Sequence, residues 1–297
     1  MKKFNGRVAV ITGAASGIGL ALAERCAREG MKLVLADIEE KRLGEVADGL
    51  RSRGSEVATL KVDVSRDDEV EALAALAYER FGAVHLLCNN AGVVPAGRFR
   101  AVWEFPLEDW KWSFDVNMMG VVHGLRSFVP RMLAAGGEAH IVNTASIAGL
   151  LSGAATPVYS AAKHAVVRIS EALYASLRDR SAPIGVTILC PGVVQTRIYD
   201  SERNRPGDLV PSGGIAAEKP EMHEAIVKMG PGGLQPAAVA DMVFDAVAAN
   251  QLYCLTTDTF DEGIRERNDA VLARRNPEFP SLLALTQKET GGRMTSG

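Results

Sequence analysis

The sequence predicts an α/β protein built on one doubly wound parallel sheet of about seven strands, with helices on both faces. Short apolar runs alternate with longer amphipathic stretches over residues 5–257, which is the order that a parallel sheet with crossover helices requires. The first run has no polar alternation, which indicates a strand covered on both faces. No repeat, low-complexity tract or Gly/Ser linker divides the chain, so we expect a single domain.

Each expected strand is a short apolar run that ends in turn or charged residues, and each expected helix is a longer amphipathic stretch. We expect strands at residues 7–11, 32–36, 57–62, 86–88, 140–144, 184–190 and 253–256. We expect helices at residues 20–28, 39–53, 66–81, 110–133, 158–179, 220–228, 236–250 and 260–275. Pro130 predicts a kink or a break in the last turns of the helix over 110–133.

Two segments of the domain, which spans residues 1–297, carry additional expectations. Residues 193–235 are rich in glycine, proline and charge, and they are longer than a simple connection usually is. We therefore expect a substrate lid there. Residues 258–297 are expected to form a helical tail that ends in polar residues.

Composition and charge exclude several classes of partner. Hydrophobic residues make up 47% of the chain, enough for a sizeable core, and the formal net charge is −3. Without a basic excess, we expect neither a nucleic-acid partner nor an anionic membrane surface. No uninterrupted apolar run reaches ~18 residues, so a membrane-spanning helix is not expected.

The cysteines are widely scattered and show neither Cys-x-x-Cys spacing nor a cysteine–histidine cluster, so we expect no metal site. They are Cys26, Cys88, Cys190 and Cys254. The simplest interpretation is a set of buried free thiols in a reducing compartment. We therefore expect a cytoplasmic protein.

A glycine-rich turn follows the first expected strand and precedes the first helix. It reads Thr-Gly-Ala-Ala-Ser-Gly-Ile-Gly over residues 12–19, with glycines at 13, 17 and 19. Without side chains at these positions, the backbone can approach a pyrophosphate closely, and the helix N-terminus offers free N–H groups. The spacing differs from the commoner Gly-x-Gly-x-x-Gly pattern, but its place between a strand and a helix favours a dinucleotide site.

Asp37 directly follows the second expected strand. A carboxylate about 20 residues past the glycine turn is placed to bind an adenosine ribose 2′-OH and to repel a 2′-phosphate. The nearby cations, Lys41 and Arg42, fall further on, in the following helix. We therefore expect NAD to be preferred over NADP. Asp37 is also a candidate cap for the helix that begins near Ile38, and both roles are compatible.

A possible proton-transfer pair follows the fifth expected strand. Tyr159 and Lys163 lie four residues apart at the start of an expected helix, so they point the same way. A neighbouring ammonium stabilises a phenolate and should lower the tyrosine pKa from its usual ~10, which would make Tyr159 a usable general acid/base. Ser146, at the end of the fifth strand, can face the same substrate oxygen. Alone, this spacing is common in helices.

Further features stand at the ends of other expected strands. An Asn-Asn-Ala-Gly turn over residues 89–92 follows the fourth strand, and Pro191-Gly192 follows the sixth. Open α/β sheets bind ligands at this edge. Together with the 12–19 turn, Asn117 and the Ser146–Tyr159–Lys163 set, these features make the chain resemble the short-chain dehydrogenase/reductase family over about residues 5–257.

The resemblance implies a Rossmann-like fold, an NAD(P)-dependent alcohol dehydrogenase or reductase, and a homotetramer or dimer. It implies that Tyr159 exchanges a proton with the substrate, that Lys163 lowers the tyrosine pKa and binds the nicotinamide ribose, that Ser146 holds the substrate oxygen, and that Asn117 holds a water next to the lysine. The cofactor-binding residues that it implies are Gly13, Ser16, Gly17, Ile18, Gly19, Asp37, Asp63, Val64, Asn90, Ala91, Gly92, Tyr159, Lys163, Pro191, Gly192, Val194 and Thr196.

The chain departs from the family at His85, where the family often has aspartate. His85 stands at the start of the fourth strand, away from the carboxyl edge, so we expect a structural or surface role rather than a catalytic one.

The expected substrate is a hydrophobic secondary alcohol or its ketone, because candidate pocket residues are mostly apolar. These are Val94, Trp103, Leu151, Val193, Ile198, Tyr199 and Met222. Arg98, Arg100 and Arg197 are the counter-evidence, since arginines can bind a carboxylate, although most arginines are simply exposed. Two alternatives remain: an NADPH-dependent reductase acting on a ketone or a 3-oxoacyl thioester, and a non-catalytic protein that senses a dinucleotide.

Overall fold

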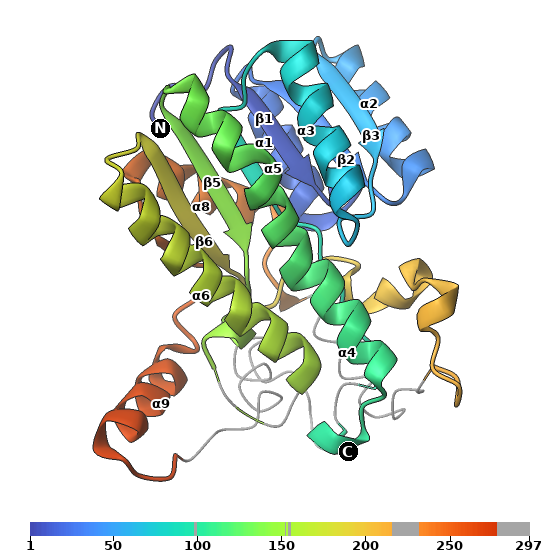
Figure 1. Ribbon diagram of the computed structural model, residues 1–297, viewed down its shortest axis with the longest axis vertical. Helices are drawn as coiled ribbons and strands as arrows, with labels where there is room; N and C mark the ends of the chain where they lie inside the picture. Colours follow the sequence, from blue (N-terminus) through green and yellow to red (C-terminus); the bar gives the residue numbers. More distant parts are fainter. Residues whose placement is uncertain (98–99, 152, 154–155, 216–231, 278–297) are drawn as a thin grey trace.

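The computed structural model describes residues 1–97, 100–151, 153, 156–215 and 232–277. Its sheet has seven parallel strands in the order β3-β2-β1-β4-β5-β6-β7, which confirms the predicted fold class (Figure 1). The strands are β1 Val8–Thr12, β2 Lys32–Asp37, β3 Val57–Lys61, β4 Leu86–Asn89, β5 Ala139–Thr144, β6 Ile184–Cys190 and β7 Tyr253–Leu255.

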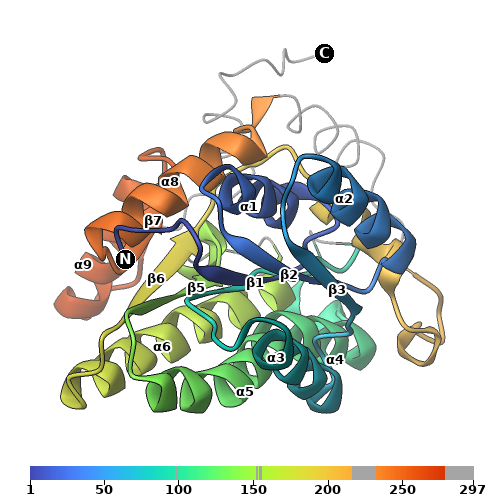
Figure 2. The same ribbon diagram turned by 90° about the horizontal axis from the view of Figure 1, so that it is seen from above.

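Helices cover both faces of this sheet. The helices α1, α2 and α8 lie on one face and α3, α5 and α6 on the other, as Figure 2 shows from above. Their bounds, with α4 and α9, are α1 Gly17–Arg28, α2 Glu40–Ser52, α3 Asp67–Phe81, α4 Leu107–Phe114, α5 Gly120–Ala135, α6 Pro157–Asp179, α8 Pro236–Ala249 and α9 Asp261–Ala273. None of these helices is long and apolar enough to cross a membrane.

The strand order reverses between β1 and β4, which pair directly although two strands separate them in sequence. Connections on either side of this reversal leave in opposite directions, so the carboxyl ends of β1 and β4 open a crevice. The central strands are fully buried, as continuous apolar runs require. The four cysteines are buried free thiols, as predicted.

The helix predicted over 110–133 is longer and less regular than expected. It consists of α4, a π-helical turn at Asp115–Met119 and α5. Pro130 lies inside α5 without ending it, so the predicted break is wrong and helical structure continues to Ala135. The π turn instead falls at Asn117, and such turns are frequent at functional sites.

Two sequence expectations fall partly outside the described residues. The helix expected over 220–228 lies in the segment 216–231, and the end of the expected tail lies beyond residue 277. The described part of the tail contains α9. Phe260, just before α9, packs with Ile147 and Leu151, so the C-terminal region supports the turn that follows β5.

His85 and His140 each form a side-chain contact with a residue of a neighbouring strand. The Nδ1 atom of His85 accepts a hydrogen bond from the Val8 N–H (3.1 Å), in line with the structural role expected for it. His140, on β5, is fully buried, and its Nε2 contacts the Thr187 hydroxyl at 2.8 Å. Because that hydroxyl donates to the Gln251 carbonyl, His140 is the donor to Thr187. Its Nδ1 has no hydrogen-bond partner among the described residues.

We predict that His140 makes the fold acid-sensitive. Burial lowers its pKa to about 3, against about 6.5 in an unfolded chain. The unfolded state therefore binds more protons between these values, and the free energy of unfolding falls as pH drops below about 6.5, by up to about 1.4 kcal/mol per pH unit. Between pH 7 and 4.5, wild type should lose about 2 kcal/mol more than His140→Gln, which keeps a donor for Thr187. Denaturant titrations at both pH values measure this, and parallel losses would contradict it.

Candidate active site

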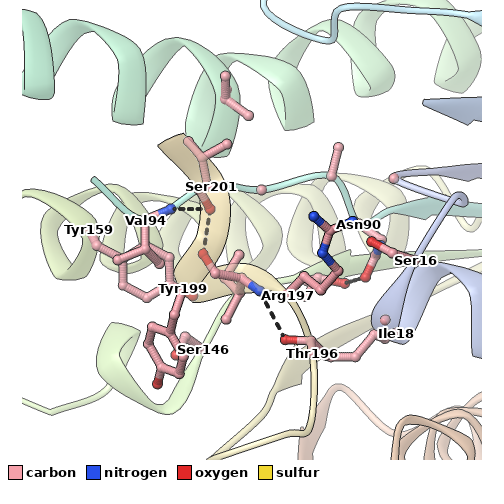
Figure 3. Close-up of a pocket in the computed structure, with 18 of the residues that line it drawn as sticks. Ser16, Ile18, Asn90, Val94, Ser146, Tyr159, Thr196, Arg197, Tyr199 and Ser201 are labelled. Atoms are coloured by element: carbon pink, nitrogen blue, oxygen red, sulfur yellow. Dashed lines mark hydrogen bonds between the residues drawn. The ribbon is translucent and has the colours of Figure 1, made fainter. Parts of the chain in front are cut away.

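A cavity lies at the carboxyl edge of the sheet and is lined by the turns after β1, β2, β4, β5 and β6 (Figure 3). All the predicted cofactor and catalytic residues line it except Gly19 and Asn117. One end contains Asp37, and the other contains Ser146 and Tyr159. Most of the residues that the sequence singled out therefore line one cavity, although they come from turns far apart in the chain.

The glycine turn is packed tightly against the turn after β4. Gly13 has a φ of +68°, and a Cβ there would lie 2.9 Å from the Ala91 Cα. A Cβ on Gly19 would overlap the carbonyl oxygen of Gly13. These positions leave room only for backbone, which is the cradle that a pyrophosphate needs.

Thr12 joins the two turns, and the sequence analysis missed it as a site residue. Its hydroxyl accepts hydrogen bonds from the backbone N–H groups of Asn90 (3.0 Å) and Ala91 (3.1 Å). The Asn90 side chain in turn donates to the Thr12 carbonyl at 3.1 Å and accepts from the Thr144 hydroxyl at 3.2 Å. Asn90 thus connects the ends of β1, β4 and β5.

Asp37 is held in place at the end of β2 by two backbone hydrogen bonds. One carboxylate oxygen accepts from the Glu39 N–H (2.9 Å) at the start of α2, and the other from the Ala15 N–H (2.9 Å) in the glycine turn. Burial raises the pKa of this carboxyl, although both backbone hydrogen bonds oppose that shift. The carboxylate lines the cavity at the end where an adenosine ribose would bind.

The other end of the cavity brings together Ser146, Tyr159 and Lys163, which the sequence predicted to be catalytic. Tyr159 is in the first turn of α6, and Lys163 is one turn further on. The Lys163 ammonium donates to the Thr144 carbonyl at 2.8 Å and lies 5.6 Å from the centroid of the Tyr159 ring. The Ser146 hydroxyl accepts from the Ala148 N–H at 3.1 Å, which orients it at the end of β5.

The pKa of Tyr159 is shifted in the direction opposite to the sequence expectation. Burial raises it above the usual value, while the hydrogen bond with Ser146 opposes that shift. Burial also lowers the pKa of Lys163 to about 8. The same enclosure disfavours both charges, so Lys163 is a weaker source of positive potential than an exposed lysine would be.

Asn117 is buried beneath the cavity rather than exposed in it. Its side-chain oxygen accepts from the Val93 N–H (3.1 Å), and its amide nitrogen donates to the Val93 carbonyl (2.9 Å) and to Ser113. A Cβ on Gly92 would lie 2.8 Å from that oxygen and 3.4 Å from the Lys163 Nζ. The asparagine therefore fixes a cavity-lining backbone next to the lysine.

The wall near Tyr159 is formed by the segment after β4 and a helical turn, η4 (Ile198–Asn204), after β6. The Val94 N–H donates to the Ser201 hydroxyl at 3.1 Å, and the Ala96 N–H to Glu202 at 2.7 Å. Figure 3 shows Tyr199 of this turn beside Ser146 and Tyr159. The mostly apolar lining residues at this end include Val93, Val94, Trp112, Val116, Ile147, Ala148, Val193, Ile198, Tyr199 and Phe260.

Some predicted pocket residues are placed elsewhere. Trp103 is 83% exposed and does not line the cavity, because the loop that carries it turns outward before α4. Leu151 is buried under the turn after β5 instead. Met222 and Arg98 lie outside the described residues.

The fold and this glycine-rich crevice at its switch point are those of dinucleotide-binding oxidoreductases. The family model "short chain dehydrogenase" matches residues 7–207. The chain therefore belongs to the short-chain dehydrogenase/reductase family and is an oxidoreductase enzyme.

The proteins similar to this chain include the following three. A short-chain dehydrogenase/reductase from Burkholderia phymatum, crystallised in complex with NAD, is 45% identical with a TM-score of 0.88, covering 94% of this chain and 99% of that one. The 1-deoxy-11-beta-hydroxypentalenate dehydrogenase of Streptomyces exfoliatus is 35% identical over 89% of this chain and 88% of its own. The cyclohexanol dehydrogenase of Acinetobacter sp. strain SE19 is 38% identical over 65% of this chain and 75% of its own.

We predict that Gly19→Ala weakens binding of NADH at least about tenfold, because its Cβ forces the turn away from the Gly13 carbonyl. Fluorescence titration measures the affinity. Gly44→Ala is the matched control, since a Cβ there meets nothing within 4 Å and alanine favours a helix by up to about 1 kcal/mol. Equal NADH affinities for the two variants would contradict the tight-turn argument.

Proposed function

We propose that this protein is an NAD-dependent dehydrogenase that interconverts a hydrophobic secondary alcohol and its ketone, with Tyr159 as the general acid/base. The observation that carries the proposal is the continuity of one cavity from Asp37, at the ribose end, to Ser146 and Tyr159 at the catalytic end. A dinucleotide held along it would reach both groups.

The residues present fit such a cofactor. The glycine turn leaves a cradle that any Cβ would fill, Asp37 offers a carboxylate to a ribose diol, and Thr196, Asp63 and Val64 line the same cavity. When bound, NAD supplies the hydride chemistry of the reaction. The Asp37 carboxylate supports NAD over NADP, because a 2′-phosphate would meet its negative charge.

The side chains at the catalytic end supply one route for the proton. In ketone reduction, Tyr159 donates its phenolic proton to the substrate oxygen, which Ser146 also hydrogen-bonds. The raised pKa keeps this phenol protonated near neutral pH. Lys163, whose pKa is about 8, can then return a proton, since a group titrating near neutral pH exchanges protons most readily. The second lone pair of the Asn117 oxygen is available for the water that links the lysine to solvent.

The apolar lining supports a hydrophobic substrate. Arg100 is ion-paired with Asp109 (3.0 Å), and Arg197 with Asp200 (2.7 Å), so neither described arginine is available to bind a carboxylate. The name of the cyclohexanol dehydrogenase points the same way, because cyclohexanol is an uncharged cyclic secondary alcohol. Alcohol oxidation is the proposed direction.

A screen of secondary alcohols of graded size, followed by NADH absorbance, tests this proposal. Turnover should increase from small acyclic to cyclic and aryl alcohols and should be faster with NAD than with NADP. A clear NADPH preference would overturn the Asp37 argument and favour the ketone or 3-oxoacyl reductase. No turnover across the panel, with NAD still bound, would favour the dinucleotide sensor.

We predict that Tyr159→Phe lowers kcat by about 10²- to 10⁴-fold, the usual contribution of a positioned general acid/base. Its affinity for NADH should change less than about twofold, because the ring that packs in the cavity is kept. Steady-state kinetics and fluorescence titration measure the two quantities. Tyr253→Phe is the control, since the Tyr253 hydroxyl bonds Glu171 on the surface. Full activity of Tyr159→Phe would exclude the proposed role.

A further inference from the structure

A second carboxylate, Glu39, lies beside Asp37 in the same end of the cavity, and the site as described does not use it. One of its oxygens accepts hydrogen bonds from the Arg203 Nε (2.9 Å) and Nη2 (2.6 Å) and from the Asn204 amide (3.2 Å). Its other oxygen lies 3.8 Å from the Arg197 guanidinium. Glu39 therefore stands at the centre of a charged cluster.

This cluster joins two parts of the chain that are far apart in sequence. Glu39 precedes α2, whereas Arg203 and Asn204 end the η4 turn, 164 and 165 residues away. The Arg203 guanidinium also donates to the carbonyls of Arg197 and Asp200, so all of its nitrogens have partners. The η4 turn is thereby held over the ribose end of the cavity.

The negative charge of Glu39 is stabilised by its partners in the cluster. Partial burial acts to raise the pKa of Glu39, but hydrogen bonds from Arg203 and Asn204 hold it below its usual value. A ligand at this end thus meets the carboxyl groups of Asp37 and Glu39, and Arg203, which lines the same cavity, is paired with Glu39. A 2′-phosphate brings about −1.5 to −2 further charges and is an ideal bidentate partner for arginine.

We propose that the Glu39–Arg203 ion pair is a second determinant of cofactor choice: Glu39 rejects a 2′-phosphate directly and also occupies the arginine that would otherwise bind it. The inference rests on the proposed preference for NAD. It predicts that Arg203 becomes a 2′-phosphate ligand as soon as the charge of Glu39 is removed. The cofactor preference is then set by η4 as well as by the end of β2.

Glu39→Gln is the sharpest test, because glutamine keeps an acceptor that can hold Arg203 in place while removing the negative charge. The affinity for NADPH should increase about tenfold or more, and that for NADH should fall less than about threefold, since a charge-assisted arginine–phosphate contact is gained. The double variant Glu39→Gln/Arg203→Met should lose the gain. Affinities come from fluorescence titration, and thermal melting verifies that each variant folds.

Glu40→Gln is the matched control, since it removes the same charge one residue further along from an exposed side chain outside the cavity. Its ratio of NADPH to NADH affinity should stay within about twofold of wild type. If Glu39→Gln does not fold, Glu39→Ala replaces it with the same expectations. A ratio unchanged from wild type in the Glu39 variant, or a gain that persists without Arg203, overturns the inference.

The wild-type measurement separates this inference from the proposed function. The ratio of wild-type affinities for NADH and NADPH tests the proposed preference, whereas the change of that ratio on replacing Glu39 tests the ion pair. A wild type that prefers NADPH together with an unresponsive Glu39 variant would reject both. A wild type that prefers NADH with an unresponsive variant would reject only the inference.

Discussion

The close approach of the β1 and β4 turns is the contact on which the rest of the site depends. It requires glycine at position 13, because a Cβ there would lie 2.9 Å from the Ala91 backbone, and it is secured by the Thr12 hydroxyl. With the two turns held together, Gly92 is pressed against Asn117 and Lys163. Backbone contacts therefore fix the position of the glycine turn relative to the Lys163 side chain.

The second constraint is the burial of Tyr159 and Lys163, which changes the pKa values of both side chains. Burial raises the pKa of Tyr159 and lowers that of Lys163 to about 8. Both shifts favour neutral forms, so the charge-separated pair of a phenolate and an ammonium is costly in this site. The hydrogen bond with Ser146 opposes the shift of Tyr159 but does not reverse it. The Tyr159 phenol is therefore protonated at neutral pH.

The sequence predicted what local chemistry determines and missed what distant contacts determine. Turn residues such as Gly13 and Asp37 can be recognised in the sequence, because the pattern of a strand precedes them and that of a helix follows. The exposure of Trp103, the role of Thr12 as a connector and the Glu39–Arg203 pair have no local signature, since each depends on residues brought close by folding. The predicted direction of the Tyr159 pKa shift was wrong for the same reason. Helical spacing identifies Lys163 as a neighbour of Tyr159, but the burial that raises the tyrosine pKa depends on the whole fold.

Charged residues at the end of η4 form buried ion pairs within the protein. Arg205 is 2% exposed at its side chain, pairs with Asp109 and Glu202, and stacks over Trp112 at 4.3 Å. Trp112 in turn lines the cavity. Breaking such a buried pair costs about 3–5 kcal/mol, so these charges are committed to each other and not to a ligand. Arg100 and Arg197, two of the arginines that the sequence left as possible carboxylate receptors, are likewise paired, with Asp109 and Asp200.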